Sequence, residues 1–359
     1  PHKCVRREPP QKPAVNSNPE TISPFVLKRS YDIIHQKEKK MNIKLLKEDD
    51  YISVMNSENK KWREENVKQG TFKSFDGTKI NYYYAIPKER KGNIMMFHGY
   101  SEFFGKYHEM AWYFFQEGYA FFFMEMRGHG YSQRFVDRMD YVWVDTYDNY
   151  VDDQKAFYDK VVKDKLGKKP LYLFCHSMGG AVGALFLEKY PDIFKKAVLS
   201  SPMLQINTGS YPRLVVRAVM WYARRRRLGK MPGPGQREWD PVDRADREYT
   251  YSKARYDYVK EMQLEDVHHQ TCCATFGWMD ASFKADRKLV RNASKCVTPV
   301  LLFQAGADTL VTAEGQNRFA KKAHDVTVVR YEKAAHEIFS DAYDTRVDYF
   351  TRLFTFLQS

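Results

Sequence analysis

The sequence predicts an α/β fold built on a doubly wound, mostly parallel sheet. Short apolar runs recur along the chain, and amphipathic stretches of helical length separate them. A run that is apolar at every position is typical of a strand buried on both faces, as in a parallel sheet. Strands that alternate with helices indicate βαβ units. With 359 residues, the chain is long enough for one large core domain that carries an insertion.

The strand pattern begins near residue 67. Residues 70–75 and 79–84 are expected to form two strands joined by a tight turn at Asp76-Gly77. Further apolar runs, each expected to be a strand, lie at 93–97, 119–124, 171–175, 197–200, 300–303 and 327–331. Helices are expected near 107–117, 145–164, 178–190, 313–323 and 341–357.

The alternation stops between about 203 and 290, which predicts a helical cap inserted over the carboxyl end of the sheet. The chain then divides into three parts. An N-terminal tail and a charged helical extension occupy 1–61, the α/β core is formed by 62–202 together with 291–359, and the cap is formed by 203–290.

The formal net charge of +13 raises the question of an anionic partner. No nucleic-acid motif is present and the lysines are scattered, so no nucleic-acid partner is predicted. Solubility with weak affinity for anionic surfaces is the favoured explanation, and peripheral contact with an anionic membrane surface is the second. The sequence does not indicate an oligomeric state.

The five cysteines fit neither a disulfide framework nor a zinc site, because their number is odd and their spacing irregular. Reduced thiols favour a cytoplasmic location. No stretch reaches the roughly 18 consecutive apolar residues of a membrane span. Since the chain starts at Pro1 without a methionine, a removed leader stays an open alternative, as does peripheral attachment to a membrane.

A candidate nucleophile, Ser177, lies in the run Cys175-His176-Ser177-Met178-Gly179-Gly180, between an apolar strand and a helix of small residues. A serine at such a sharp turn exposes its Oγ, and the helix N-terminus favours negative charge beside it. A lone Ser-x-Gly is more often an ordinary helix cap, but the strand–turn–helix context favours the nucleophile. Cys175 stands where the G-x-S-x-G pattern has its first glycine, and Cys is small enough to preserve the turn.

Two further residues complete a candidate catalytic triad in the chain order expected after such a turn. Asp308 follows the strand near 300–304, and His336 lies in the loop before the last helix. His336 is expected to accept the proton of Ser177, and Asp308 to fix the imidazole tautomer. Singly, Asp308 would be a loop cap and His336 a surface group; their order and their places after strands favour the triad.

The oxyanion hole is expected to use the backbone amides of Met178 and Tyr100. The segment Arg127–Ser132 ends the neighbouring strand and is expected to brace the loop that contains Tyr100. The pair His268-His269 lacks a clear metal partner. Neither a metal nor an organic cofactor is therefore predicted.

Together, His98-Gly99, Arg127-Gly128-His129-Gly130-x-Ser132, the run around Ser177, Gly306-Ala307-Asp308-x-x-Val311 and Ala335-His336-Glu337 carry a family resemblance. Over residues 62–358 the chain resembles the serine-aminopeptidase-like α/β-hydrolases, and within them the bacterial lysophospholipases and monoacylglycerol lipases. The resemblance implies the α/β-hydrolase fold and a cap over the active site.

The resemblance implies that the chain hydrolyses the carboxylic ester of a single-chain lipid, either a lysophospholipid or a monoacylglycerol. A short-chain esterase, thioesterase or aminopeptidase with the same triad is an alternative, as is a non-catalytic binding protein on this fold. Glu102, Trp221 and Trp278 are expected to contact the substrate. The cap aromatics could line an acyl tunnel or simply pack the cap on the core: Tyr211, Trp221, Tyr222, Tyr256, Tyr258, Phe276, Trp278 and Phe283.

Overall fold

A computed structural model of the chain describes residue 41 and residues 43–208, 212–242 and 250–359. Its centre is an eight-stranded sheet with the strand order β1-β2-β4-β3-β6-β7-β9-β10. The strands are β1 (Lys68–Lys73), β2 (Lys79–Ala85), β3 (Gly92–Phe97), β4 (Tyr119–Met124), β6 (Leu171–His176), β7 (Lys196–Ser200), β9 (Val300–Ala305) and β10 (Val326–Tyr331). The strands expected from the sequence are confirmed, and so is the fold class.

The sheet is parallel from β4 to β10, whereas β1 and β2 pair antiparallel at one edge. The expected turn joins β1 to β2, with Thr78 N–H donating to Asp76 Oδ1 at 3.0 Å. Gly77 adopts a φ of +84° there, a conformation that glycine reaches without strain. The parallel strands bring their carboxyl ends to one edge of the sheet, where binding groups gather in open α/β folds.

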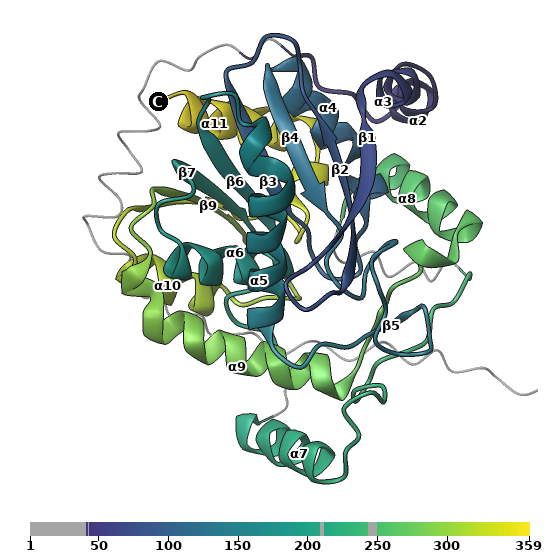
Figure 1. The fold of residues 1–359 in the computed structure, drawn as a ribbon, viewed down its shortest axis with the longest axis vertical. Helices are drawn as coiled ribbons and strands as arrows, with labels where there is room; N and C mark the ends of the chain where they lie inside the picture. Colours follow the sequence, from purple (N-terminus) through teal and green to yellow (C-terminus); the bar gives the residue numbers. More distant parts are fainter. Residues whose placement is uncertain (1–40, 42, 209–211, 243–249) are drawn as a thin grey trace, which may run out of the picture.

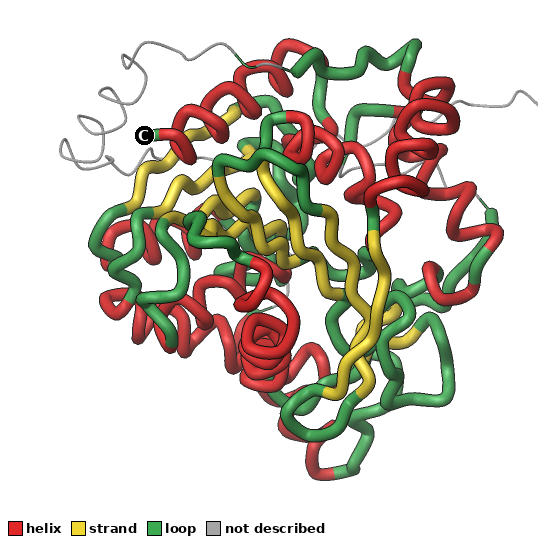
Figure 2. Tube along the Cα trace, turned by 45° about the horizontal axis from the view of Figure 1, so that its top comes forward, coloured by secondary structure: helices red, strands yellow, loops and turns green. Residues whose placement is uncertain are grey.

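Both faces of the sheet are buried under helices (Figures 1 and 2). Along β3, Met95 and Phe97 point to one core and Ile94 and Met96 to the other, as alternating side chains must. The first core is covered by α5 (Tyr147–Phe157), α6 (Met178–Lys189), α9 (Phe276–Asn292) and α10 (Ala313–Lys322). The second is covered by α3 (Lys60–Asn66), α4 (His108–Gln116) and α11 (Tyr343–Gln358).

The interval 203–290 is helical, but its helices take up different places. Helix α9 packs on the core helices α5, α6 and α10, while α7 (Arg213–Arg225) lies against α9 at the periphery (Figure 1). Helix α8 (Lys253–Glu265) contacts α2 (Tyr51–Val54) and the turn Phe104–Tyr107. A two-stranded parallel sheet, β5 (Tyr141–Val142) with β8 (Cys273–Ala274), joins the interval to the core. These helices therefore do not share one layer over the sheet.

A buried ion cluster fixes α8 on the core. Arg255 of α8 donates to both carboxylate oxygens of Glu109 in α4, at 2.8 and 2.7 Å, and Arg346 of α11 pairs with the same carboxylate. Burial would raise the pKa of Glu109, but the two guanidinium groups hold that pKa below its ordinary value. The N-terminal extension reaches α8 through the edge-to-face contact of Tyr51 with Tyr258. The rest of the predicted extension, residues 1–40, lies outside the described residues.

Arg127, expected to brace the loop near Tyr100, instead joins the β1–β2 turn to α5. Its guanidinium binds Asp153 through Nε and Nη2 at 2.6 and 2.7 Å, and Asp76 through Nη1 at 3.0 Å. Asp153 is fully buried and also accepts the hydroxyl of Ser74. A bidentate guanidinium is the partner that such a buried carboxylate needs.

Replacing this guanidinium should destabilise the fold strongly. Arg127→Met leaves the Asp153 carboxylate buried without its main partner, so the free energy of unfolding should fall by about 3–5 kcal/mol. Lys288→Met is the control, because Lys288 and its partner Asp148 are both about half-exposed; there the loss should stay below about 1 kcal/mol. Urea unfolding measures both, and equal losses would contradict the assignment.

Candidate active site

The backbone of Ser177 is strained. Its φ of +50° and ψ of −117° lie in a region that residues other than glycine rarely adopt. Ser177 N–H donates to Ser200 O at 3.1 Å, and Ser177 O accepts the amides of Gly180 and Met203 at 2.8 Å each. These three bonds hold the turn between β6 and α6, and the Ser177 side chain reaches the cavity at the carboxyl edge of the sheet.

Glycines make this turn sterically possible. A Cβ on Gly179 would lie 2.1 Å from the carbonyl oxygen of Phe97 in the next strand. A Cβ on Gly183, one turn later in α6, would lie 2.3 Å from Cys175 Sγ. Cys175 replaces the first glycine of the G-x-S-x-G pattern, and its sulfur fits because Gly183 of α6 has no side chain.

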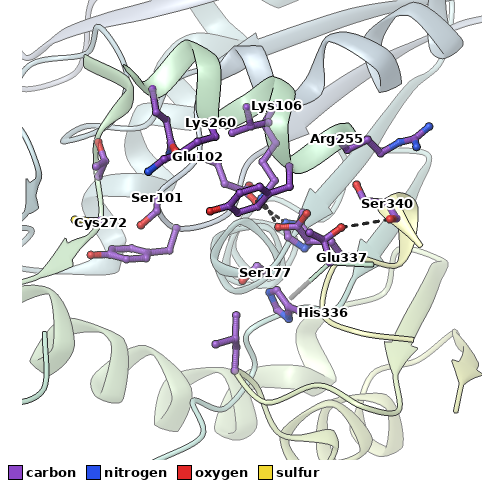
Figure 3. A pocket seen from close by; sticks show the side chains of 18 of the residues that line it. Ser101, Glu102, Lys106, Ser177, Arg255, Lys260, Cys272, His336, Glu337 and Ser340 are labelled. Atoms are coloured by element: carbon purple, nitrogen blue, oxygen red, sulfur yellow. Dashed lines mark hydrogen bonds and ion pairs between the residues drawn. The ribbon is translucent and has the colours of Figure 1, made fainter. Parts of the chain in front are cut away.

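Asp308 and His336 lie in direct contact. His336 Nδ1 is 2.7 Å from Asp308 Oδ2, and Asp308 Oδ1 accepts the amides of Leu310 and Val311 at 2.8 and 3.1 Å. Because an ionised carboxylate only accepts, the imidazole proton lies on Nδ1 and the lone pair on Nε2. His336 Nε2 is buried and has no hydrogen-bond partner among the described residues. Figure 3 shows Ser177 and His336 at the same cavity.

Neither amide proposed for the oxyanion hole is used elsewhere in the part of the chain that the structure describes. Met178 is the first residue of α6, where a helix leaves its amides without internal acceptors. Tyr100 lies in the loop after β3 and lines the cavity, and its N–H has no described acceptor. Both amides are thus available to a ligand oxygen.

Glu102, expected to contact the substrate, lines the cavity but is saturated by the protein. Its Oε2 accepts Gly99 N–H and the hydroxyl of Tyr107, the latter at 2.5 Å. Its Oε1 lies 2.8 Å from Lys106 Nζ and 3.1 Å from His176 Nδ1. Burial would raise the pKa of Glu102, but the Lys106 ammonium and His176 hold it well below its ordinary value. The carboxylate therefore closes the loop His98–Glu102 on itself.

Three residues near Ser177 and His336 were not predicted as members of the site: His176, Lys106 and Glu337. His176 was expected to point elsewhere, yet it lines the cavity with its ring centroid 5.0 Å from that of His336. Lys106 bridges Glu102 and Glu337, the residue after His336. The four-residue spacing of Glu102 and Lys106 was the available signal, because opposite charges at this spacing often pair; here Glu102 precedes the turn Phe104–Tyr107 that contains Lys106.

The loop before Glu102 is also tied to the neighbouring strand. His98 Nε2 accepts the amide of Met126 at 2.8 Å, and His98 Nδ1 lies 2.7 Å from Gly99 O. Burial lowers the pKa of His98 to about 4, so the imidazole stays neutral and can accept that bond. Within the expected segment 127–132, His129 contacts the loop, with its ring centroid 5.1 Å from that of His98 and 5.9 Å from that of Tyr100.

The two tryptophans expected at the substrate lie elsewhere. Trp278 is buried behind the oxyanion loop, with its ring 4.5 Å from that of Tyr100. Trp221 is 61% exposed on α7 and borders a different groove. Of the cap aromatics named from the sequence, Tyr256 is the one described residue that lines the cavity, and Trp239 of the same interval, which that set did not include, lines it as well. Tyr211 lies outside the described residues.

The cavity has a volume of about 710 Å³ and a mixed lining. Its apolar residues include Met110, Val259, Phe339 and Phe350. Its charged residues include those of the 237–240 segment and Lys260. The combination fits an amphiphile, since an apolar chain and a polar group are accommodated together.

A family model described as serine aminopeptidase, S33 matches residues 88–343, which include Ser177, Asp308 and His336. The chain belongs to the serine aminopeptidase S33 family. The match begins before β3 and ends at the start of α11, so it covers most of the sheet together with the 203–290 interval.

Several relatives resemble the chain at modest identity. Lysophospholipase L2 of Escherichia coli K12 is 27% identical over 263 residues, 72% of this chain and 76% of that protein. Monoacylglycerol lipase of Mycolicibacterium smegmatis is 26% identical over 276 residues, 76% and 90% of the two chains. Human monoglyceride lipase is 27% identical over 248 residues, 68% and 75%.

Solved structures agree on the fold. A soluble variant of monoglyceride lipase from Saccharomyces cerevisiae, in complex with a substrate analog, superposes with a TM-score of 0.63 at 19% identity, covering 80% of this chain and 94% of that one. Monoacylglycerol lipase of Paleococcus ferrophilus gives a TM-score of 0.57 at 22% identity, covering 76% and 96%. The S33 chain therefore has the α/β-hydrolase fold that its sequence predicts.

The contact between α6 and β6 predicts a compensating pair of substitutions. Gly183→Ala places a methyl group against Cys175 Sγ, so stability should fall by about 1–3 kcal/mol. In a Cys175→Gly background the same change should lose much less, because the sulfur is gone. A double-mutant cycle by urea unfolding measures the coupling. Additive losses would show that the two side chains do not compete for this space.

Proposed function

We propose that this chain is a serine hydrolase that cleaves the carboxylic ester of a single-chain lipid through an acyl-enzyme on Ser177. The observation that carries the chemistry is the 2.7 Å contact of His336 Nδ1 with Asp308, beside a strained serine in one cavity. The S33 family membership and the names of the relatives, lysophospholipase and monoacylglycerol lipase, support the ester and the lipid.

In the proposed reaction, His336 Nε2 takes the proton of Ser177 as its Oγ attacks the acyl carbonyl carbon. The carbonyl oxygen becomes an oxyanion, which the amides of Tyr100 and Met178 stabilise. The intermediate collapses, the alcohol leaves with the proton from His336, and the acyl group stays on Ser177. A water molecule, deprotonated by His336, then releases the fatty acid and restores the serine.

The mixed lining of the cavity supports the substrate class. Apolar residues such as Met110 and Phe350 suit an acyl chain, and the charged residues suit a glycerol or phosphoglycerol group. No helix among the described residues is long and apolar enough to cross a bilayer. The substrate is an amphiphile, so we also propose that the enzyme works at the surface of an anionic membrane, to which its charge of +13 is attracted.

Labelling with a fluorophosphonate probe tests the nucleophile. The wild-type chain should be labelled at Ser177, and Ser177→Ala should lose the label, because the strained serine beside His336 is the activated hydroxyl. Peptide mapping locates the adduct. Ser101→Ala is a matched control, since Ser101 lines the same cavity on the other loop. Labelling of Ser101, or no labelling of the wild-type chain, would overturn the catalytic assignment.

Turnover on a substrate panel tests the lipid class. Lysophospholipids and monoacylglycerols of increasing chain length should be hydrolysed with rising kcat/KM, because each added methylene buries more apolar surface. Acetyl esters, thioesters and aminoacyl amides complete the panel. A preference for any of these short substrates would contradict the lipid assignment while leaving the Ser177 chemistry in place.

Glu102→Gln tests the role of the carboxylate that closes the oxyanion loop. If this carboxylate positions Tyr100 N–H, kcat should fall roughly 10²–10³-fold with little change in KM, as for loss of an oxyanion donor. Glu238→Gln is the control, because Glu238 lines the same cavity but is exposed. Unfolding of both variants is measured in parallel. A rise in KM at constant kcat would instead indicate that Glu102 binds the substrate directly.

A further inference from the structure

Helix α7 presents apolar side chains to solvent. Leu214 is 76% exposed, Trp221 61%, Tyr222 54% and Val215 49%. Their spacing places them on one side of the helix, because residues one, four, seven and eight positions apart share a face. A contiguous exposed apolar face of this kind marks a contact surface in soluble proteins.

The opposite side of α7 already faces the body of the protein. Met220 and Ala223 are buried there, and α7 contacts α9. The outward apolar face is therefore not the side by which the helix is attached. An ordinary surface helix has an apolar face inward and a polar face outward. The outward apolar residues of α7 therefore indicate that this face binds a partner other than the body of the protein.

The charge around this face has one sign. Residues 213–230 contain seven basic side chains and no acidic one. Arg217 and Arg224 follow one edge of the apolar face by their helical spacing, and Arg225 lies within it at its carboxyl end. Within the described part of the chain, Arg217 and Arg225 form no ion pair, and Arg224 reaches Asp280 only at 3.8 Å.

A groove beside α7 extends the apolar surface. It has a volume of about 1240 Å³, with Ile206 and Phe283 among its apolar residues. Its charged residues have both signs: Arg287, Arg291 and Arg318 line it, and so do Asp280, Asp286 and Glu314. Attraction to an anionic headgroup therefore comes from the arginines of α7 itself, whereas the groove adds apolar surface for acyl chains.

We propose that α7 docks the protein on an anionic phospholipid membrane. Leu214, Val215, Trp221 and Tyr222 enter the boundary between headgroups and acyl chains, and the arginines bind lipid phosphates. A second copy of the chain is a poorer occupant, because two such basic faces repel each other. Tryptophan and tyrosine together suit a boundary that is apolar on one side and wet on the other.

The docking face also adjoins the catalytic loop. Leu310 lines the catalytic cavity, and Thr312, two residues later, lines the groove beside α7. Asp308 belongs to the same short segment. The docking itself does not depend on the proposed function. The advantage of docking does rest on the proposed lipid substrate, because a docked enzyme would receive an amphiphile from the membrane that holds it.

The test is binding to vesicles by flotation, carried out in the full chain with Ser177→Ala so that turnover plays no part. Vesicles of phosphatidylcholine alone are compared with vesicles that also contain phosphatidylserine. The protein should float with the anionic vesicles and not with the neutral ones. Arg217→Gln with Arg225→Gln should weaken that binding about 25-fold, because each basic residue at the surface contributes about fivefold.

Matched controls separate the α7 face from the overall charge. Lys68→Gln with Lys88→Gln removes two exposed charges elsewhere and should change binding less than about twofold, because distant charges are screened. Leu214→Ser with Trp221→Ser should weaken binding strongly, whereas Leu264→Ser, an exposed leucine on α8, should not. Equal losses for the two charge pairs, or unchanged binding of Leu214→Ser with Trp221→Ser, would overturn the proposal.

Two further measurements distinguish the alternatives. Sedimentation equilibrium of the wild-type chain should show a monomer; a dimer that Trp221→Ser dissociates would assign the face to a second copy and overturn the membrane proposal. The α7 variants that keep Ser177 should hydrolyse a water-soluble ester at the same rate as the wild-type chain. If the enzyme lacks lipase activity but Ser177→Ala still binds anionic vesicles through α7, the proposed function fails and the docking proposal stands.

Discussion

The strained backbone of Ser177 sets the requirements for the rest of the site. A non-glycine residue with this φ and ψ raises the free energy of the folded state by about 1–3 kcal/mol, which its surroundings must offset. The carbonyl of Ser200 and the amide of Met203 offset it by fixing both sides of the turn. Close packing of α6 on β3 is possible only because Gly179 has no side chain. The nucleophile is thus held by three neighbouring strands and the chain after them.

A second constraint is the burial of charge beside the triad. Lys106 lies between Glu102 and Glu337, which places one ammonium between the oxyanion loop and the loop of His336. Burial alone would favour the neutral forms of Glu102 and Lys106, whereas their pairing lowers the pKa of Glu102 and raises that of Lys106. Since Glu102 also binds Gly99 N–H, the two loops that flank Ser177 are coupled through one buried network. Contacts within the protein therefore fix the relative placement of the two loops.

Local patterns in the sequence were enough to predict the strands and the contact of Asp308 with His336 at the cavity of Ser177. The apolar runs identified the strands, because burial on both faces requires uniform hydrophobicity, and their ends located Ser177, Asp308 and His336. Long-range pairing could not be predicted, since nothing in the sequence links Glu102 to His176, or Arg127 to Asp153. The positions of the aromatic residues of 203–290 could not be predicted for a related reason. Composition counts a tryptophan in the same way whether it packs behind a loop, as Trp278 does, or faces solvent, as Trp221 does.

The interval 203–290 can serve several purposes because its helices are attached with different strength. Helix α9 is part of the core layer, and α8 is fixed by the buried pair of Arg255 with Glu109 while it lines the catalytic cavity. Among the described side chains of α7, only Met220 and Ala223 are buried. A helix attached so lightly contributes little to global stability and can be exposed, apolar and basic without disturbing the fold. That freedom is absent near Ser177, where a single added methyl group meets the backbone of the next strand.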